Sequence, residues 1–202
     1  MKVDSSEIDQ DSSSPTSQGE MILFYRILSV SGITLCLYLV QYLSLYIANR
    51  PSKKKSKNII YWDSFKYGQI SSSHVSDHYS IFNLLAGIGL HYFTSALLGP
   101  TREQKFLLAL ITQIVLESAV NNPFFLDSFG SKLFDTSYSG DTVLNSVMDT
   151  VWFMTGNLFA VKLPYPVLLG MLGVLELYRG VYLRENVFSI VLKMKNTLLG
   201  LE

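Results

Sequence analysis

The chain has 202 residues, of which 49% are hydrophobic and only 16% are charged, and its 16 basic and 16 acidic side chains give a formal net charge of zero. An average soluble domain carries roughly 25% charged residues. The single cysteine, Cys36, excludes an intrachain disulfide and a cysteine-based metal cluster. These properties favour a membrane protein over a soluble domain.

Residues 1–20 are Ser-rich and acidic, with Lys2 as their one basic residue. A signal peptide needs a basic start and an apolar middle, and a transit peptide is rich in Arg, so this segment matches neither. We expect residues 1–20 to form a solvated tail.

The first long apolar segment occupies residues 21–49, and it carries no charge between Ile27 and Asn49. About 20 apolar residues cross a bilayer, so this segment predicts a transmembrane helix. A soluble helical bundle is the alternative, because later apolar segments contain ionisable groups. The first segment would be hard to bury inside a soluble protein of this size.

Residues 50–80 form a basic loop, which could bind nucleic acid or anionic lipid. Its basic cluster consists of Arg50, Lys53, Lys54, Lys55 and Lys57. More commonly, such a cluster reflects the orientation of the protein in the membrane, because short loops rich in Lys and Arg stay on the inner side of the membrane. We therefore expect the tail outside, this loop and the C-terminus inside, and no nucleic-acid partner.

Four more candidate spans follow in residues 81–202, which we expect to form a four-helix membrane domain with a short amphipathic segment at its C-terminus. They are Ile81–Gly99, a segment from Phe106 that includes Glu117, Asp141–Val161, and Leu163–Leu183. The sequence thus predicts an all-α polytopic membrane protein with about five transmembrane helices.

A polar stripe opens the fourth span, where Asp141, Asn145 and Asp149 follow one another at steps of four. Residues four apart share a helix face. Ionisable groups at membrane depth are costly unless paired, so we expect the stripe to face other polar groups. Helix capping by Asp141 is an equally good explanation of that residue. The predicted structural polar seam comprises Glu117, Asn121, Asp141, Asn145, Asp149, Glu176, Arg179 and Arg184.

A second polar stretch contains His74, Asp77 and His78, residue types that suit metal binding or acid/base chemistry. A capped, solvated loop is the commoner meaning of such a stretch. The chain has no Gly-rich phosphate loop, Cys-x-x-Cys pair or His-Glu-x-x-His element. We expect no metal site and no cofactor other than bound phospholipid.

From about Ser72 to Lys193 the chain resembles a family of small alphaproteobacterial inner-membrane proteins with a domain of unknown function. The clearest likeness is to the family pattern Gly-Asp-Ser-x-x-Asn-Ser-x-x-Asp, which falls on Gly140, Asp141, Thr142, Asn145, Ser146 and Asp149. Further likenesses fall on Glu117 with Asn121, on Arg184 with Asn186, and on Asp77 with Ser80. A more distant likeness, which includes Gly156, is to VanZ-like membrane proteins.

The chain also departs from this family pattern where the family carries an acid, an Arg-Tyr-Arg triplet and two histidines. Those positions hold Val120, then Ser128, Phe129 and Gly130, and then Asn83 and Ala86. Losing these groups would disable a reaction. The resemblance therefore implies a non-catalytic membrane scaffold, an accessory subunit of a mitochondrial respiratory or ATP-synthase complex that contacts lipids and other membrane subunits. The alternative is a bacterial inner-membrane enzyme or lipid-handling protein that uses the inner-face polar cluster.

Overall fold

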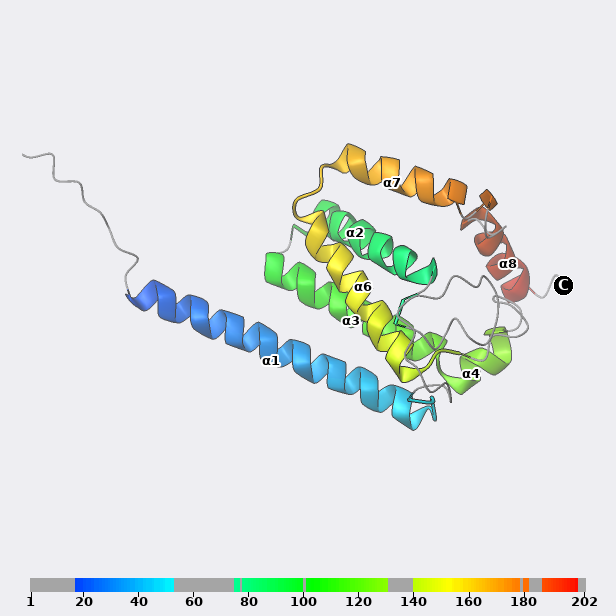
Figure 1. Cartoon of the computed structure of the whole chain (residues 1–202), viewed down its shortest axis with the longest axis horizontal. Helices are drawn as coiled ribbons and strands as arrows, with labels where there is room; N and C mark the ends of the chain where they lie inside the picture. The colour runs from blue at the N-terminus through cyan, green and yellow to red at the C-terminus, as the bar shows by residue number, and fades with distance from the viewer. Residues whose placement is uncertain are drawn as a thin grey trace, which may run out of the picture.

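The computed structural model describes residues 17–52, 75–76, 78–99, 101–130, 140–178, 180–181 and 187–199, and within these ranges every regular element is helical. The elements are α1 Ser17–Ile47, α2 His78–Leu98, α3 Arg102–Val120, α4 Pro123–Phe125, the π-helical η2 Leu126–Gly130, α6 Val143–Ala160, α7 Tyr165–Tyr178 and α8 Val187–Leu199. The predicted all-α class is confirmed for the described part of the chain (Figure 1).

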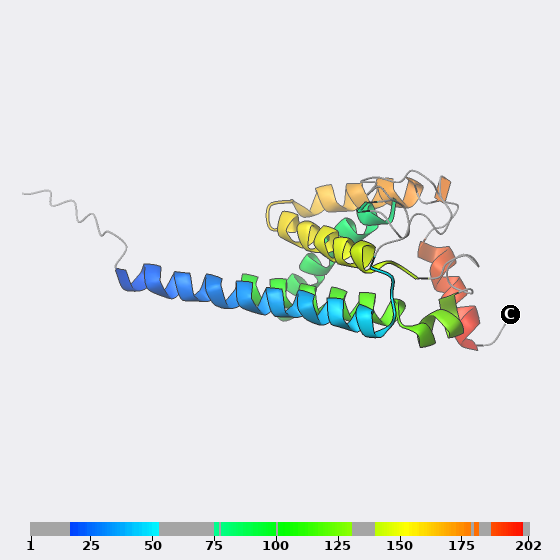
Figure 2. The same ribbon diagram turned by 60° about the horizontal axis from the view of Figure 1, so that its bottom comes forward.

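Helix α1 is much longer than the other helices and runs beside α3, and its N-terminal end projects beyond the start of α3 (Figures 1 and 2). Its 31 residues give a length of about 46 Å, more than the roughly 30 Å of a bilayer core. Leu35 is 73% exposed, whereas Gln41 and Leu45 are fully buried. The helix begins at Ser17, so it includes the end of the predicted tail.

By length and composition, two helices qualify as membrane spans, Gly19–Ile47 and Tyr79–Leu97. A third span is possible if α3 and Pro123–Phe129, which meet at a bend of 60°, count as one broken span. The break has a local cause: Asn122 caps α4, and Pro123 has no amide hydrogen with which to continue α3.

The structure supports two or three of the five predicted spans. Helix α6 has the predicted position, but polar residues such as Asn145, Asp149 and Asn157 lower its hydropathy. Helix α7 ends at Tyr178 after 14 residues, about 21 Å, which is shorter than a bilayer core. Of the rest of the predicted range Leu163–Leu183, residues 180–181 are π-helical, and residues 179, 182 and 183 lie outside the described residues.

Helices α2 and α6 approach closely at two glycines. A Cβ atom on Gly87 would lie 1.9 Å from the carbonyl oxygen of Phe153, and one on Gly156 would lie 1.8 Å from that of Leu84. Small residues let helix backbones approach, which is a common device in membrane helix packing. Gly156 thus has a packing role in this fold.

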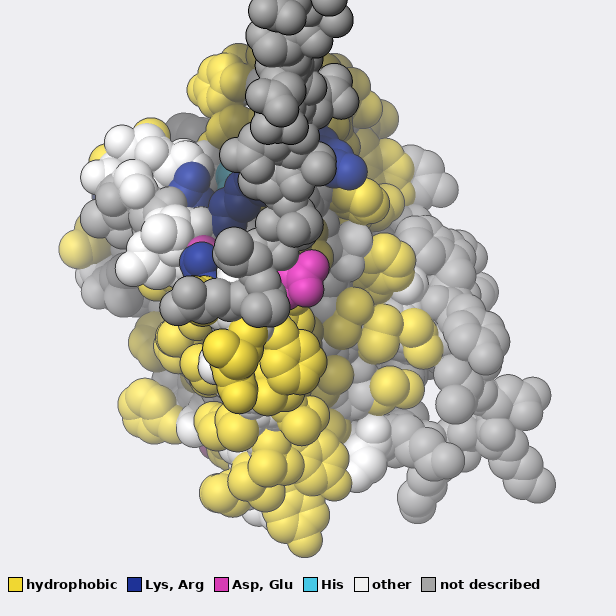
Figure 3. Space-filling view, turned by 90° about the vertical axis from the view of Figure 1, so that its left-hand side faces the viewer, with side chains coloured by type: hydrophobic (Ala, Val, Ile, Leu, Met, Phe, Trp, Pro, Cys, Tyr) yellow, Lys and Arg dark blue, Asp and Glu magenta, His cyan; other side chains and the backbone are white. Residues whose placement is uncertain are grey.

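Apolar side chains fill the space on both sides of α6. One cluster joins α3 to α6 and contains Ala109, Leu110, Ile114, Phe153 and Met154. The other joins α2, the end of α6 and α7, and contains Leu85, Ile88, Ala160 and Leu168. Large hydrophobic side chains also remain exposed on the outer faces, including the end of the molecule from which α1 projects (Figure 3).

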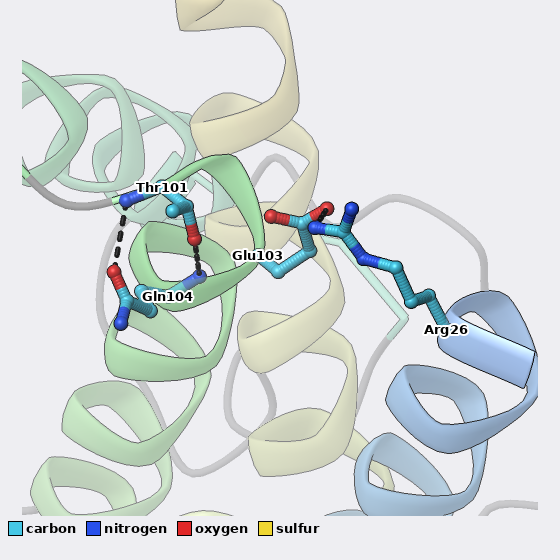
Figure 4. Close-up of polar contacts among 4 residues, drawn as sticks. All are labelled: Arg26, Thr101, Glu103 and Gln104. Atoms are coloured by element: carbon cyan, nitrogen blue, oxygen red, sulfur yellow. Dashed lines mark hydrogen bonds and ion pairs between the residues drawn. The ribbon is translucent and has the colours of Figure 1, made fainter. Parts of the chain in front are cut away.

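The start of α3 is held by polar contacts (Figure 4). Gln104 N donates to Thr101 Oγ1 at 3.4 Å, and Thr101 N donates to Gln104 Oε1 at 2.9 Å, which together form a capping box. Arg26 on α1 forms an ion pair with Glu103 at 2.8 Å. Both partners are exposed, so this pair contributes little to stability.

Candidate polar centre between three helices

Buried and half-buried polar side chains gather where the C-terminal ends of α1 and α3 meet the N-terminal part of α6. We call this group the polar centre, and it comprises Gln41, Gln113, Glu117, Asn121, Asp141, Asn145, Ser146, Asp149 and Thr150. The predicted seam residues on α3 and α6 all belong to it. Asn145 and Asp149 are four residues apart, so they share the face of α6 that packs against α1 and α3.

Gln41 joins α1 to α6. Its Nε2 donates to Thr150 Oγ1 at 2.8 Å and to the carbonyl oxygen of Ser146 at 3.1 Å. All three residues are fully buried. These hydrogen bonds fix the depth at which the apolar α1 packs against α6.

Glu117 joins α3 to α6. Its Oε2 accepts a hydrogen bond from Ser146 Oγ at 2.7 Å, and its Oε1 accepts one from Gln113 Nε2 at 3.0 Å. Asn121 extends this connection, because its Oδ1 accepts from the backbone N–H of Asp141 at 2.6 Å. The structure thus brings Glu117 and Asn121 of the predicted seam to the start of α6.

Three carboxylates meet in the polar centre. Glu117, Asp141 and Asp149 each offer an oxygen, and these oxygens lie within 4.8 Å of one another. Asp149 is 6% exposed, and its Oδ2 accepts from Asn145 Nδ2 at 3.0 Å. Charged carboxylates this close repel each other, so the cluster favours a bound proton or cation.

Arg50, the first residue of the basic loop, follows the end of α1 at Ile47 and lies beside the acids. Its Nε donates to the carbonyl oxygen of Asp141 at 3.0 Å. A Cβ on Gly140 would lie 2.5 Å from an Arg50 nitrogen, and Gly140 has a φ of +84°, which favours glycine. Gly140 therefore lets the guanidinium approach the turn before α6.

The N-cap of α6 is Thr142, whose side chain accepts from Asn145 N at 3.2 Å. Asp141 comes one residue before this cap, so Thr142 caps α6 and Asp141 does not. Asp141 instead contributes to the group of three acids.

The remaining predicted residues are not brought into the polar centre by the contacts described above. Glu176 lies on α7, which packs against α2. Arg179, Arg184, His74 and Asp77 lie outside the described residues, and of His78 only the helical backbone is described.

Sequence reasoning missed five members or neighbours of this site: Gln41, Gln113, Ser146, Thr150 and Arg50. Gln41 gave a usable signal, because it is a lone amide within an otherwise apolar and uncharged run. Such a group requires a partner in a membrane. Ser146 and Thr150 lie one step beyond Asn145 and Asp149, on the adjoining edge of the same face.

The fold and the polar centre define a class, a small all-α protein with two or three candidate membrane spans around buried acids and amides. A family model described as "Protein of unknown function (DUF2585)" matches residues 45–198. The chain belongs to this family. The match includes the three carboxylates and Arg50, whereas Gln41 and most of α1 precede it.

Similar proteins come from alphaproteobacteria. A UPF0314 protein of Sinorhizobium fredii is 32% identical over 136 residues, which cover 66% of this chain and 68% of the relative. A UPF0314 protein of Brucella anthropi is 28% identical over 76% of this chain and 79% of the relative, and one of Sphingopyxis alaskensis is 27% identical over 74% and 80%. No solved structure matches the chain. These bacterial relatives give no support to a mitochondrial complex.

Proposed function

We propose that this protein is a non-catalytic helical scaffold of the alphaproteobacterial inner membrane, an accessory subunit of a larger membrane complex. One observation carries the proposal: side chains of the polar centre bond from helix to helix, as Gln41 on α1 and Glu117 on α3 both do to Ser146 on α6. Hydrogen bonds between membrane helices stabilise by roughly 1 kcal/mol each, so several together can hold three helices in register.

The outer surface suits the same role. Large hydrophobic side chains are exposed on α1 and α7, among them Phe24, Leu35 and Val174. Lipid or neighbouring subunits would cover such surfaces in a membrane. We propose phospholipid and other membrane subunits as partners, and no nucleic acid.

The orientation belongs to the proposal too. The tail faces outward, while the basic loop and the C-terminus face the cytoplasm, because Lys and Arg concentrate in that loop. Four further points remain predictions: the five spans, the family's inner-membrane location, its Gly-Asp motif and the distant VanZ likeness.

A membrane enzyme or lipid-handling protein is the second candidate. The convergence of three carboxylate oxygens within 4.8 Å favours it, because clustered acids also occur where enzymes bind cations or move protons. The weak site at His74, Asp77 and His78 would belong to this alternative.

Native gel electrophoresis of detergent-solubilised membranes tests the scaffold against the enzyme. We compare the tagged full-length protein with a triple variant in which His74, Asp77 and His78 become Ala, with Glu117→Gln, and with Gly87→Leu. The scaffold predicts an assembly much larger than the 22.7 kDa chain. The triple variant and Glu117→Gln should keep it, because Gln can still accept from Ser146, whereas Gly87→Leu should lose it.

The enzyme becomes the better account if the purified chain, free of partners, turns over a phospholipid and the triple variant or Glu117→Gln abolishes that turnover at unchanged membrane abundance. Migration of the wild-type protein as a single chain in mild detergent would also count against an accessory subunit.

A further inference from the structure

We propose that Glu117, Asp141 and Asp149, together with the amide oxygen of Asn145, bind one divalent cation of the oxygen-preferring class (Mg²⁺, Mn²⁺ or Ca²⁺). The sequence analysis expected no metal, since it interpreted the Asp141 stripe as a contact between helices or, for Asp141, as a helix cap. The packing of α3 against α6 adds Glu117 to the stripe and creates a set of three acids from two elements.

The spacing of the acids suits such an ion. Their ligand oxygens lie within 4.8 Å of one another. Oxygens on opposite sides of a Ca²⁺ ion at about 2.3–2.6 Å are about 4.6–5.2 Å apart, and those around the smaller Mg²⁺ are closer. Carboxylate and amide oxygens are the ligands that these hard cations prefer.

Asn145 provides an independent indication of a ligand. Its side chain is 2% exposed, and its Nδ2 donates to Asp149 Oδ2, so the amide lies against the acids. Its Oδ1 is buried and accepts no hydrogen bond from any described residue. A buried acceptor without a partner is costly, and a cation held by the neighbouring carboxylate would satisfy it.

The charges near the site also call for a cation. Among the described residues, Glu117, Asp141 and Asp149 carry three negative charges when ionised, and Arg50, bonded to the backbone of Asp141, supplies one positive charge. A divalent cation makes the sum zero, which lowers the cost of placing these groups among apolar helices. The hydrogen bonds to Glu117 leave lone pairs on its carboxylate oxygens for the ion.

Binding of Mn²⁺ to the full-length protein in detergent micelles tests the site. The protein is stripped with EDTA, dialysed and titrated with Mn²⁺, and free Mn²⁺ is followed by electron paramagnetic resonance. We expect saturable binding of about one ion per chain, competition by Mg²⁺ or Ca²⁺, and a melting temperature that rises with Mn²⁺ and falls with EDTA.

Glu117→Gln and Asp149→Asn keep the shape of their side chains and remove a charge, so each should weaken Mn²⁺ binding at least tenfold. Glu103→Gln is the matched control, because Glu103 lies on the same helix as Glu117 but pairs with Arg26 at the helix start. The control should bind as the wild type does.

Wild-type protein without saturable binding and without a Mn²⁺-dependent melting temperature would overturn the proposal, whether or not the variants fold. Equal binding by Glu117→Gln and Glu103→Gln would overturn it as well, because the ion would then be bound elsewhere. The proposal does not depend on the scaffold role, since native-gel assembly and Mn²⁺ binding can each fail while the other succeeds.

Discussion

Gly87→Ala is expected to separate α2 from α6. The added Cβ would lie 1.9 Å from the carbonyl oxygen of Phe153, whereas a carbon and an oxygen in contact need about 3.3 Å. The backbones must therefore move apart by about 1.4 Å, because a carbonyl in the middle of a helix cannot turn aside. The shift would also lengthen the hydrogen bond from Asn157 Nδ2 to Gly87 O, already 3.4 Å.

Overpacking of this kind costs about 1–3 kcal/mol, and more where the backbone is fixed. Gly89→Ala is the matched control on the same helix, since a Cβ there meets nothing within 4 Å. That control should be neutral or stabilise by about 0.5–1 kcal/mol, because Ala favours helix over Gly.

Thermal unfolding of the purified full-length variants in mild detergent, followed by tryptophan fluorescence, measures the difference. We expect Gly87→Ala to melt below the wild type and Gly89→Ala at or above it. Equal melting temperatures for the two variants would refute the close α2–α6 contact.

Two further predictions concern the polar centre and the topology. Asn145→Leu should lower the free energy of unfolding by about 1–3 kcal/mol, since it removes the hydrogen bond that Asn145 Nδ2 donates to the buried Asp149. Unfolding in mild detergent measures this, and wild-type stability would contradict it. A tag with one reactive thiol placed after Lys55, in a chain with Cys36→Ser, should resist a membrane-impermeant reagent added to intact spheroplasts and react after lysis. Labelling before lysis would reverse the proposed orientation.

The sequence was informative where polar residues repeat at helical spacing. Asp141, Asn145 and Asp149 stand at steps of four, and the cost of burying an acid among apolar residues led to Glu117 as their partner. The position of Arg50 in the sequence could not predict its contact with the turn before α6. Its contact with Asp141 depends on a positive φ at Gly140 and on the end of α1 reaching that turn.

Helix lengths were harder to predict than helix positions. After Pro166 the sequence has no proline as far as Leu183, so the sequence carries no proline signal for the end of α7 at Tyr178. The approach of α2 to α6 was also beyond the sequence. Gly87 and Gly89 look alike in one apolar run, and only the register between two helices distinguishes them.

Cysteine cross-linking between α1 and α3 tests most directly the central claim that these helices meet at the polar centre. Ser44 Oγ and Ser118 Oγ lie 2.8 Å apart. In a Cys36→Ser background, Ser44→Cys with Ser118→Cys should form an intrachain disulfide in native membranes under mild oxidation, while Ser29→Cys with Ser118→Cys, with its thiol about four turns earlier on α1, should not. Failure of the first pair to cross-link, or equal cross-linking of both pairs, would contradict the account.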